Sequence, residues 1–130
     1  MRLLLDTHVW LWRLLAPERI SDPAEQAIAG DGNELFLSPI SVWETLVLAR
    51  KGRLTLLPDP HQWVVEALRR SALRSLPLTH DVALRSERLA GLRSQDPADR
   101  FLVSTALEHQ TAFITADQAI QAFAPLRTIW

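Results

Sequence analysis

The sequence predicts an α/β protein built on a parallel sheet. Short apolar runs of the length of buried strands alternate along the chain with longer segments that start at a capping residue and end near a glycine. Strands that alternate with helices are typical of parallel sheets, in which a helix connects one strand to the next. The 130 residues contain no internal repeat and no low-complexity linker, so we expect one domain over residues 1–130.

The first three elements follow from local composition. Residues 2–6 contain three consecutive leucines and are predicted as a short, fully buried strand. Residues 7–15 follow as a helix that is apolar nearly all round, so this helix is either buried on both sides or covered by a partner. Residues 21–32 have a serine, an acid and a proline at their start and glycines at their end, as a short capped helix does.

The middle of the chain repeats this alternation. Residues 35–38, with the sequence LFLS, are the second predicted strand. Residues 38–52 are predicted as a helix because they have a serine cap, a proline in the first turn and a glycine stop. Residues 59–72 begin with an aspartate and a proline and are predicted as the next helix.

The last part of the chain gives three strands and two helices. Residues 73–78 are a short strand, and residues 79–92 form a helix that begins at a threonine. Residues 96–110 form another helix, again with aspartate and proline at its start. Residues 111–117, with the sequence TAFITAD, and residues 125–130 complete the predicted sheet.

The composition excludes several kinds of chemistry. Hydrophobic residues make up 48% of the chain and charged residues 22%, which is typical of a globular protein. The absence of cysteine excludes disulfides, thiolate zinc sites and a cysteine nucleophile, and it is compatible with a cytoplasmic location. The four histidines lack metal-site spacing, and the chain has no P-loop, G-x-G-x-x-G or G-x-S-x-G motif. The net charge of −1 gives no overall basic field that would indicate nucleic acid.

The apolar N-terminal stretch is not expected to be a membrane segment. Asp6, His8 and Arg13 interrupt it, and the stretch is too short to span a bilayer. We therefore interpret it as part of the folded protein.

Two aspartates come directly after predicted strands. Asp6 follows the three leucines, and Asp117 follows the sequence FITA. In open parallel sheets, ligands gather beyond the carboxyl ends of the strands. An ionised carboxylate is seldom buried without a partner, so Asp6 needs compensation between such apolar flanks. The alternative is that each aspartate only caps the helix that follows it.

A glutamate lies on an apolar helix stripe. Glu44 is spaced to share one helix face with four large apolar residues: Ile40, Trp43, Val47 and Leu48. This spacing predicts that its carboxylate points inward. The alternative is a glutamate at the edge of the stripe, or one that is paired with an arginine.

The helix at residues 96–110 carries two acids near its start. Asp96 precedes a proline and is explained as the N-cap, which also allows an i, i+4 pair with Arg100. Asp99 is explained less well by capping, because it shares its face with Leu102, Val103 and Ala106. We therefore expect Asp99 to face inward.

The strand-end aspartates and the inward-facing helix acids predict one pocket. At 4 Å, each like-charged pair would repel by about 4 kcal/mol with an effective dielectric constant near 20. A divalent cation would offset this repulsion, and a ligand set of oxygens without cysteine favours Mg²⁺ or Mn²⁺. Carboxylates that hold such an ion are suited to phosphodiester hydrolysis, because the metal activates a water and stabilises charge on phosphate oxygens.

Four stretches, LLLDTHVWLW, SPISVWE, DPADRFLVSTA and FITAD, occur in the order and spacing that PIN-domain proteins show. Over essentially its whole length the chain resembles a PIN-domain ribonuclease of the VapC toxin type. The resemblance implies a three-layer α/β/α sandwich with a central, mainly parallel sheet. It also implies Mg²⁺- or Mn²⁺-dependent endonucleolytic cleavage of RNA, an antitoxin protein that binds and inhibits the nuclease, and frequent homodimers.

The resemblance also assigns site residues by position. The quartet of catalytic, metal-binding acids that it implies consists of Asp6, Glu44, Asp99 and Asp117. Asp96 matches an additional acid of the motif, and Thr115 matches a hydroxyl residue that supports the last aspartate. Ala98 and Gln95 depart from the family pattern, which bears on packing or substrate fit but removes no metal ligand.

Two other classes of function stay open. A phosphoryl-handling hydrolase fits poorly, because the sequence DTH lacks a second acid two residues after the first, and Lys51 lies at a helix end where a receiver module needs a strand-end lysine. A non-enzymatic interaction domain with the PIN fold would be favoured by a broken quartet, and the quartet is intact.

The helix at residues 7–15 predicts association. Four large apolar residues crowd it: Trp10, Leu11, Trp12 and Leu15. A contiguous exposed apolar patch is unusual on a monomer, so we expect a homodimer, an antitoxin groove on this helix, or both.

Overall fold

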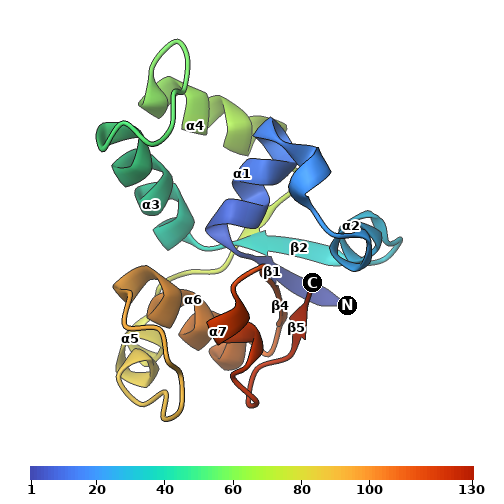
Figure 1. Ribbon diagram of the computed structural model, residues 1–130, viewed down its shortest axis with the longest axis vertical. Helices are drawn as coiled ribbons and strands as arrows, with labels where there is room; N and C mark the ends of the chain where they lie inside the picture. Colours follow the sequence, from blue (N-terminus) through green and yellow to red (C-terminus); the bar gives the residue numbers. More distant parts are fainter.

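A five-stranded sheet in the order β3-β2-β1-β4-β5 forms the centre of the computed structural model, which describes all 130 residues (Figure 1). The strands are β1 (Arg2–Leu5), β2 (Glu34–Leu37), β3 (Arg74–Ser75), β4 (Ala112–Ile114) and β5 (Thr128–Ile129). All four pairs of neighbouring strands are parallel. The predicted α/β fold with a parallel sheet is therefore confirmed, and every strand ends at the same edge of the sheet.

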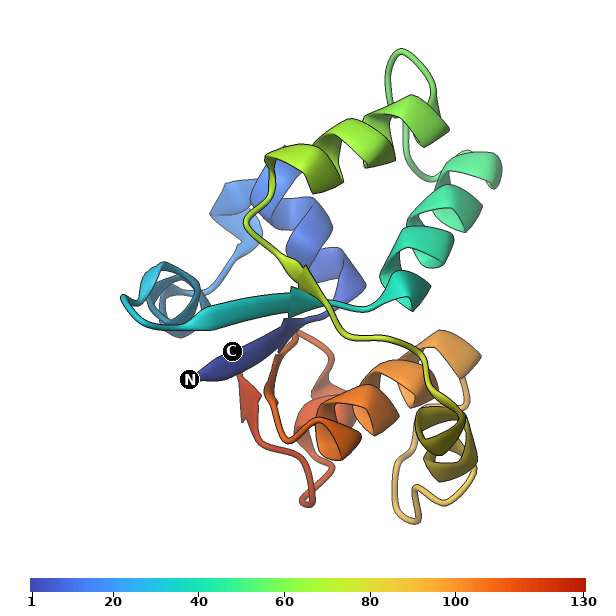
Figure 2. The same cartoon turned by 180° about the vertical axis from the view of Figure 1, so that it is seen from behind.

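Helices cover both faces of this sheet, as Figure 1 and the reverse view in Figure 2 show. The helices are α1 (Thr7–Leu15), α2 (Asp22–Ala29), α3 (Pro39–Arg50), α4 (Pro60–Arg70), α5 (His80–Ser86), α6 (Pro97–Glu108) and α7 (Gln118–Gln121), with a short 3₁₀ helix η1 (Pro17–Arg19) after α1. Helices α1, α2 and α4 lie on one side, and α5, α6 and α7 lie on the other. Helix α3 contacts both α1 and α6. This arrangement is the expected three-layer α/β/α sandwich.

Alternate residues of the strands supply two separate cores. In β1, Leu3 and Leu5 face the core beneath α1 and α2, whereas Leu4 faces the core against α6. Strands β2 and β4 alternate in the same way, so the second core contains Phe36 and Phe113. Fully burying one such side chain contributes about 1.5–3 kcal/mol, which explains why the central strands are continuously apolar.

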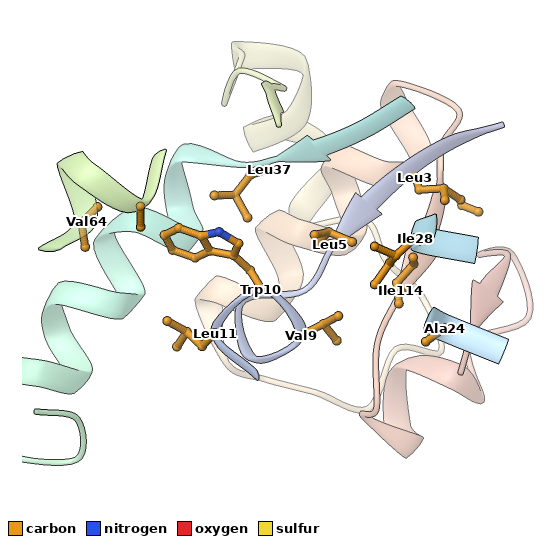
Figure 3. Close-up of a cluster of buried hydrophobic side chains, with 12 residues drawn as sticks. Leu3, Leu5, Val9, Trp10, Leu11, Ala24, Ile28, Leu37, Val64 and Ile114 are labelled. Carbon is orange, nitrogen blue, oxygen red and sulfur yellow. The ribbon is translucent and has the colours of Figure 1, made fainter. Parts of the chain in front are cut away.

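The tryptophan of α1 belongs to the first core. Figure 3 shows Trp10 within a cluster that includes Leu37 and Val64. Trp10 is 1% exposed and Leu11 is 2% exposed. The expectation that Trp10 contributes to a partner surface is therefore wrong, because the sheet and α4 bury it, whereas Leu11 still lines a groove between α1 and the end of α3. Only Leu14 and Leu15, at the end of α1, are exposed large apolar residues of this helix.

Capping residues start the helices where the sequence predicts. The side chains of Ser21, Ser38, Asp59, Thr79 and Asp96 each accept a hydrogen bond from a backbone N–H in the first turn of the following helix. The predicted helix at residues 79–92 ends earlier, at Ser86. Leu89 and Leu92 are buried in the second core from a loop, so their apolar spacing extended the predicted helix.

No helix of the chain is long and apolar enough to cross a membrane.

Candidate active site

The carboxyl ends of β1 and β4 bring two distant residues into contact. Leu5 of β1 is paired with Ile114 of β4, and the next backbone N–H, of Asp6, donates to the Ile114 carbonyl at 3.0 Å. Asp6 and Thr115 therefore leave neighbouring strands at the same level. The Thr115 hydroxyl donates a 2.6 Å hydrogen bond to Oδ2 of Asp6.

Asp6 occupies the N-cap position of α1, but its side chain does not cap the helix. The carboxylate turns instead toward Thr115 and is only 6% exposed. Burial raises the pKa of Asp6 to about 6, against the opposing effect of the Thr115 hydrogen bond. The capping alternative for Asp6 is therefore wrong: its carboxylate is held in a site where the negative charge is unfavourable.

Asp117 combines the two roles that the sequence left open. Its Oδ1 accepts a 3.1 Å hydrogen bond from the Ile120 N–H, so it caps α7. Its own backbone N–H donates to the Thr115 hydroxyl oxygen at 3.0 Å. Thr115 thus links the Asp6 carboxylate to the Asp117 backbone, which agrees with the supporting role that the resemblance implies.

Asp99 is held by a serine of the preceding loop. Asp96 caps α6 by accepting from the Ala98 N–H at 3.2 Å, and this places Asp99 in the first turn. The Ser94 hydroxyl donates a 2.7 Å hydrogen bond to Oδ2 of Asp99. Burial raises the pKa of Asp99 to about 6, against the Ser94 hydrogen bond and with smaller contributions from the negative charges of Asp6, Asp96 and Asp117. These four aspartates all line one pocket.

Glu44 reaches the same region from α3, although the predicted stripe is not the buried face of that helix. The fully buried residues of α3 are Ser41 and Thr45, and Trp43 is 53% exposed. The Thr7 hydroxyl donates to the Ser41 hydroxyl oxygen at 2.8 Å, so two small polar residues lie at the contact between α1 and α3. Glu44 is half-buried beside this contact, and its charge contributes to the raised pKa of Asp6.

All five predicted acids line one open pocket of about 480 Å³. Its lining residues are Asp6, His8, Trp12, Arg19, Glu44, Asp96, Asp99, Ala116 and Asp117. Thr115 lies behind this lining, bonded to Asp6. A larger cavity of about 610 Å³ beside α5 and α6 is lined by Arg85 and Glu108, which form an ion pair, and by none of the predicted site residues. The chemistry therefore places the candidate site in the smaller pocket.

The donor atoms of this pocket fit a hard divalent cation in type. They are carboxylate oxygens from four separate elements, with no sulfur ligand. No three acidic or histidine side chains come close enough, as they stand, to hold one ion together. Like charges in one pocket favour separated side chains, so an ion would have to draw these carboxylates inward.

Sequence reasoning missed two residues that shape the site. Ser94 is one of them. The sequence contains a pattern that could have predicted its place, because a serine often accepts a hydrogen bond from the backbone N–H two residues later. Ser94 accepts in this way from the N–H of Asp96 at 3.3 Å. Arg100 is the other, since the sequence indicated it only as an ion-pair partner of Asp96. The allowed ion pair with Asp96 is absent, and the Arg100 guanidinium donates to the carbonyls of Ser86 and Ser94 at 3.0 and 3.2 Å.

Comparisons with known proteins found relatives in sequence and in fold. The ribonuclease VapC22 of Mycobacterium tuberculosis is 33% identical over 129 residues, which cover 98% of this chain and 97% of that protein. Among solved structures, DNA-bound VapBC from Salmonella typhimurium matches with a TM-score of 0.73 at 18% identity, over 98% of this chain and 96% of that one. VapBC-1 from nontypeable Haemophilus influenzae gives a TM-score of 0.72 at 16% identity with the same coverage. The two structural matches show a shared fold.

A protein-family model matches almost the whole chain. The PIN domain model matches residues 3–125, a span that includes both strand-end aspartates, Glu44 of α3 and the start of α6. Together with the VapC22 match, this shows that the chain belongs to the PIN domain family.

Proposed function

We propose that this protein is a divalent-metal-dependent endoribonuclease and the toxin of a toxin–antitoxin pair. The observation that carries the proposal is the pocket at the carboxyl ends of the strands, where five acids converge. The relative with 33% identity is a ribonuclease, which supports RNA as the substrate. A toxin that cuts cellular RNA acts in the cytoplasm, so this is the location that we propose.

The proposed ligands of Mg²⁺ or Mn²⁺ are Asp6, Glu44, Asp99 and Asp117. When bound, such an ion lowers the pKa of a water molecule and offsets negative charge on the phosphate. The protein's own contribution is to hold the carboxylates in place. Thr115 fixes one oxygen of Asp6 and Ser94 fixes one oxygen of Asp99, so in each carboxylate the second oxygen is left for a ligand.

Asp96 has a supporting role in this proposal. Its Oδ1 accepts from the Ala98 N–H, and its backbone carbonyl accepts from the Arg100 N–H at 3.1 Å. Asp96 therefore sets the start of α6, and with it the position of Asp99. Its exposed charge adds to the negative potential of the pocket.

The test is cleavage of RNA by the purified protein. With Mg²⁺ or Mn²⁺, the protein should cut internal phosphodiester bonds of a single-stranded or structured RNA, and EDTA should stop the reaction. Asp31→Asn, which changes an exposed acid outside the pocket, is the matched control and should retain activity. Cleavage that persists in EDTA would rule out the metal mechanism.

The competing classes find no support in the geometry. Lys51 is exposed at the C-terminal end of α3 and does not line the acidic pocket, so a receiver-type phosphoryl site lacks its lysine. A non-enzymatic interaction domain would have no need of acids with unfavourable charge. Asp6 and Asp99, whose pKa values are raised by burial, therefore favour a catalytic function.

We also propose that an antitoxin binds a groove beside α1. The Salmonella typhimurium and Haemophilus influenzae structures are VapBC assemblies. In this chain, a groove of about 460 Å³ runs between α1, η1 and the end of α3, with apolar lining from Leu11, Trp12, Leu15, Ala16, Leu48 and Leu54. Arg19 and Arg53 at the same groove favour a partner segment that carries acidic as well as apolar side chains.

A charge placed in this groove tests the antitoxin site. Leu15→Glu should weaken binding of the cognate antitoxin and should leave RNA cleavage intact. Leu84→Glu changes an equally apolar exposed residue on α5 and should have no effect on either. The homodimer stays a prediction, which sedimentation of the isolated protein would check.

A further inference from the structure

One arginine lines the acidic pocket. Of the nine residues around the pocket, Arg19 is the only lysine or arginine. It is nevertheless not paired with any carboxylate. The four ion pairs of the structure involve other residues, and the Arg19 guanidinium donates no hydrogen bond within the chain.

An aromatic ring holds Arg19 in this place. The guanidinium carbon lies 4.2 Å from the ring centroid of Trp12. The ring of Trp12 packs in turn against two other rings. Its centroid lies 5.9 Å from that of Trp130 and 6.0 Å from that of His8, so these neighbours hold the indole in place. Arg19 ends the short helix η1, which starts at Pro17 directly after α1. Stacking on an aromatic face orients a guanidinium without using its N–H donors.

The other arginine near the acids is already occupied. Arg100 donates to the carbonyls of Ser86 and Ser94, which fixes the loop that positions Asp99. Arg13 is exposed on α1 and lines neither the acidic pocket nor the neighbouring groove. Arg19 is therefore the arginine that lines this pocket with unpaired donors, at the border with the groove beside α1.

We propose that Arg19 binds a phosphate of the RNA substrate next to the phosphate that is cleaved, and that Trp12 is its positioning residue. This inference rests on the proposed ribonuclease function. A pocket of five acids repels a polyanion, so a substrate backbone needs a positive group beside it. The planar guanidinium offers paired donors that match two phosphate oxygens, and no residue of the chain competes for them.

The test measures how RNA binding depends on salt. All variants carry Asp99→Asn to prevent cleavage, and the probe is a fluorescently labelled single-stranded RNA of mixed sequence with Mn²⁺ present. The logarithm of the affinity falls linearly with the logarithm of the salt concentration. The loss of one phosphate contact on single-stranded RNA makes this negative slope shallower by about 0.7. Arg19→Ala should show this decrease together with an affinity loss of about tenfold. In the background that retains Asp99, KM should rise while kcat at saturating RNA stays near its original value.

The role of Trp12 has its own readout. Trp12→Phe keeps an aromatic face and should retain most of the salt slope, whereas Trp12→Leu should lower it as Arg19→Ala does. Arg19→Lys keeps the charge but loses the planar stack, and it should give an intermediate affinity.

Arg13→Ala is the matched control, since it removes the same charge from the adjacent helix outside the pocket. Its salt slope should equal that of the parent. The proposal is overturned if Arg19→Ala leaves the slope unchanged, if Arg13→Ala lowers the slope equally, or if only antitoxin binding is weakened. A protein with intact Asp99 and Arg19 that does not cut RNA at all would overturn the proposed function itself.

Discussion

The hydroxyl of Thr115 and the carboxylate of Asp6 are joined by a 2.6 Å hydrogen bond, although 109 positions separate them in the sequence. Both residues are buried, and both lie one residue beyond a central strand. The same hydroxyl oxygen accepts the N–H of Asp117 at 3.0 Å. One side chain therefore sets the relative positions of two proposed metal ligands, and this can be tested directly.

Thr115→Val should reduce stability and activity together. Valine has nearly the volume of threonine but leaves the Asp6 oxygen and the Asp117 N–H without this partner. We expect the free energy of unfolding to fall by about 2–4 kcal/mol and cleavage by about 10–100-fold. Because the Thr115 hydrogen bond lowers the pKa of Asp6, its removal should also shift the acidic limb of the pH–activity profile upward.

Thr115→Ser separates this effect from general packing. Serine keeps the hydroxyl and loses a methyl group, so it should lower stability but leave the pH–activity profile in place. Denaturant melts and pH–activity profiles of both variants provide the measurements. Equal profiles for the valine and serine variants would show that the hydroxyl does not control Asp6.

Asp99→Asn and Asp96→Asn should differ in activity. Asp99 lines the pocket with a carboxylate held by Ser94, whereas Asp96 is exposed and caps α6. Asparagine caps a helix as well as aspartate does. We expect cleavage to fall by more than about 100-fold for Asp99→Asn and by no more than about 10-fold for Asp96→Asn. Comparable losses, measured as initial rates with Mn²⁺, would make Asp96 a direct metal ligand.

The metal-free protein should lose stability as the pH rises from about 4 to about 7. Burial raises the pKa of Asp6 and of Asp99 from 3.8 to about 6. A carboxyl whose pKa is higher in the folded protein binds its proton more tightly there, so its stabilising contribution is present below pH 3.8 and is lost as the pH passes through 6. For Asp6, the difference between a pKa of 3.8 and one of about 6 corresponds to about 3 kcal/mol.

Thermal melts in EDTA across this pH range check the prediction. Glu66 has the opposite effect, because hydrogen bonds from Arg69 and Arg70 lower its pKa from 4.5 to about 2. Its stabilising contribution is lost only as the pH falls below 4.5, so the two effects overlap only between pH 3.8 and pH 4.5. A melting temperature that rises between pH 5 and pH 7 in EDTA would contradict the assignment.

Local sequence signals predicted the central sheet and the start of most helices. The apolar run of β1 sends Leu4 to one core and Leu5 to the other, which the composition of a buried parallel strand anticipates. Acid–proline and serine–proline pairs fixed the starts of α2, α3, α4 and α6, because capping is decided by a few adjacent residues. Strands β3 and β5, with two residues each, lie at the sheet edges, where little apolar surface defines their ends.

Tertiary packing decided what local patterns could not. The stripe around Glu44 predicted an inward apolar face, but α1 meets α3 through Thr7 and Ser41, which turns Trp43 outward. The apolar composition of α1 predicted Trp10 as a residue that contacts a partner, whereas in the structure the sheet and α4 bury it. Arg19 keeps its donors free because it stacks on the ring of Trp12 and has no acidic partner. Sequence spacing predicts neither of these features.

Asp6→Asn should raise the melting temperature of the metal-free protein at pH 7.5. The buried, ionised carboxylate of Asp6 is destabilised by its surroundings and by the charge of Glu44. Asparagine removes the negative charge, and its side-chain oxygen can still accept the Thr115 hydroxyl. An increase of about 5 °C is expected from a gain of 1–2 kcal/mol in a domain of this size. Such a gain is typical of a site that trades stability for function.

The same substitution should reduce the stabilisation that metal provides. An ion that binds only the folded state stabilises it by about 2.7 kcal/mol at one hundred times its dissociation constant, and a lost ligand raises that constant. Melts of the original protein and of Asp6→Asn in EDTA and in Mn²⁺ test both effects, with Asp31→Asn as the control for an exposed acid. If Asp6 were only a structural residue, Asp6→Asn would melt lower than the original protein in EDTA, and Mn²⁺ would shift neither. The opposite pair of results, a higher melting temperature without metal and a smaller shift with it, requires Asp6 to belong to a charged site that binds a cation.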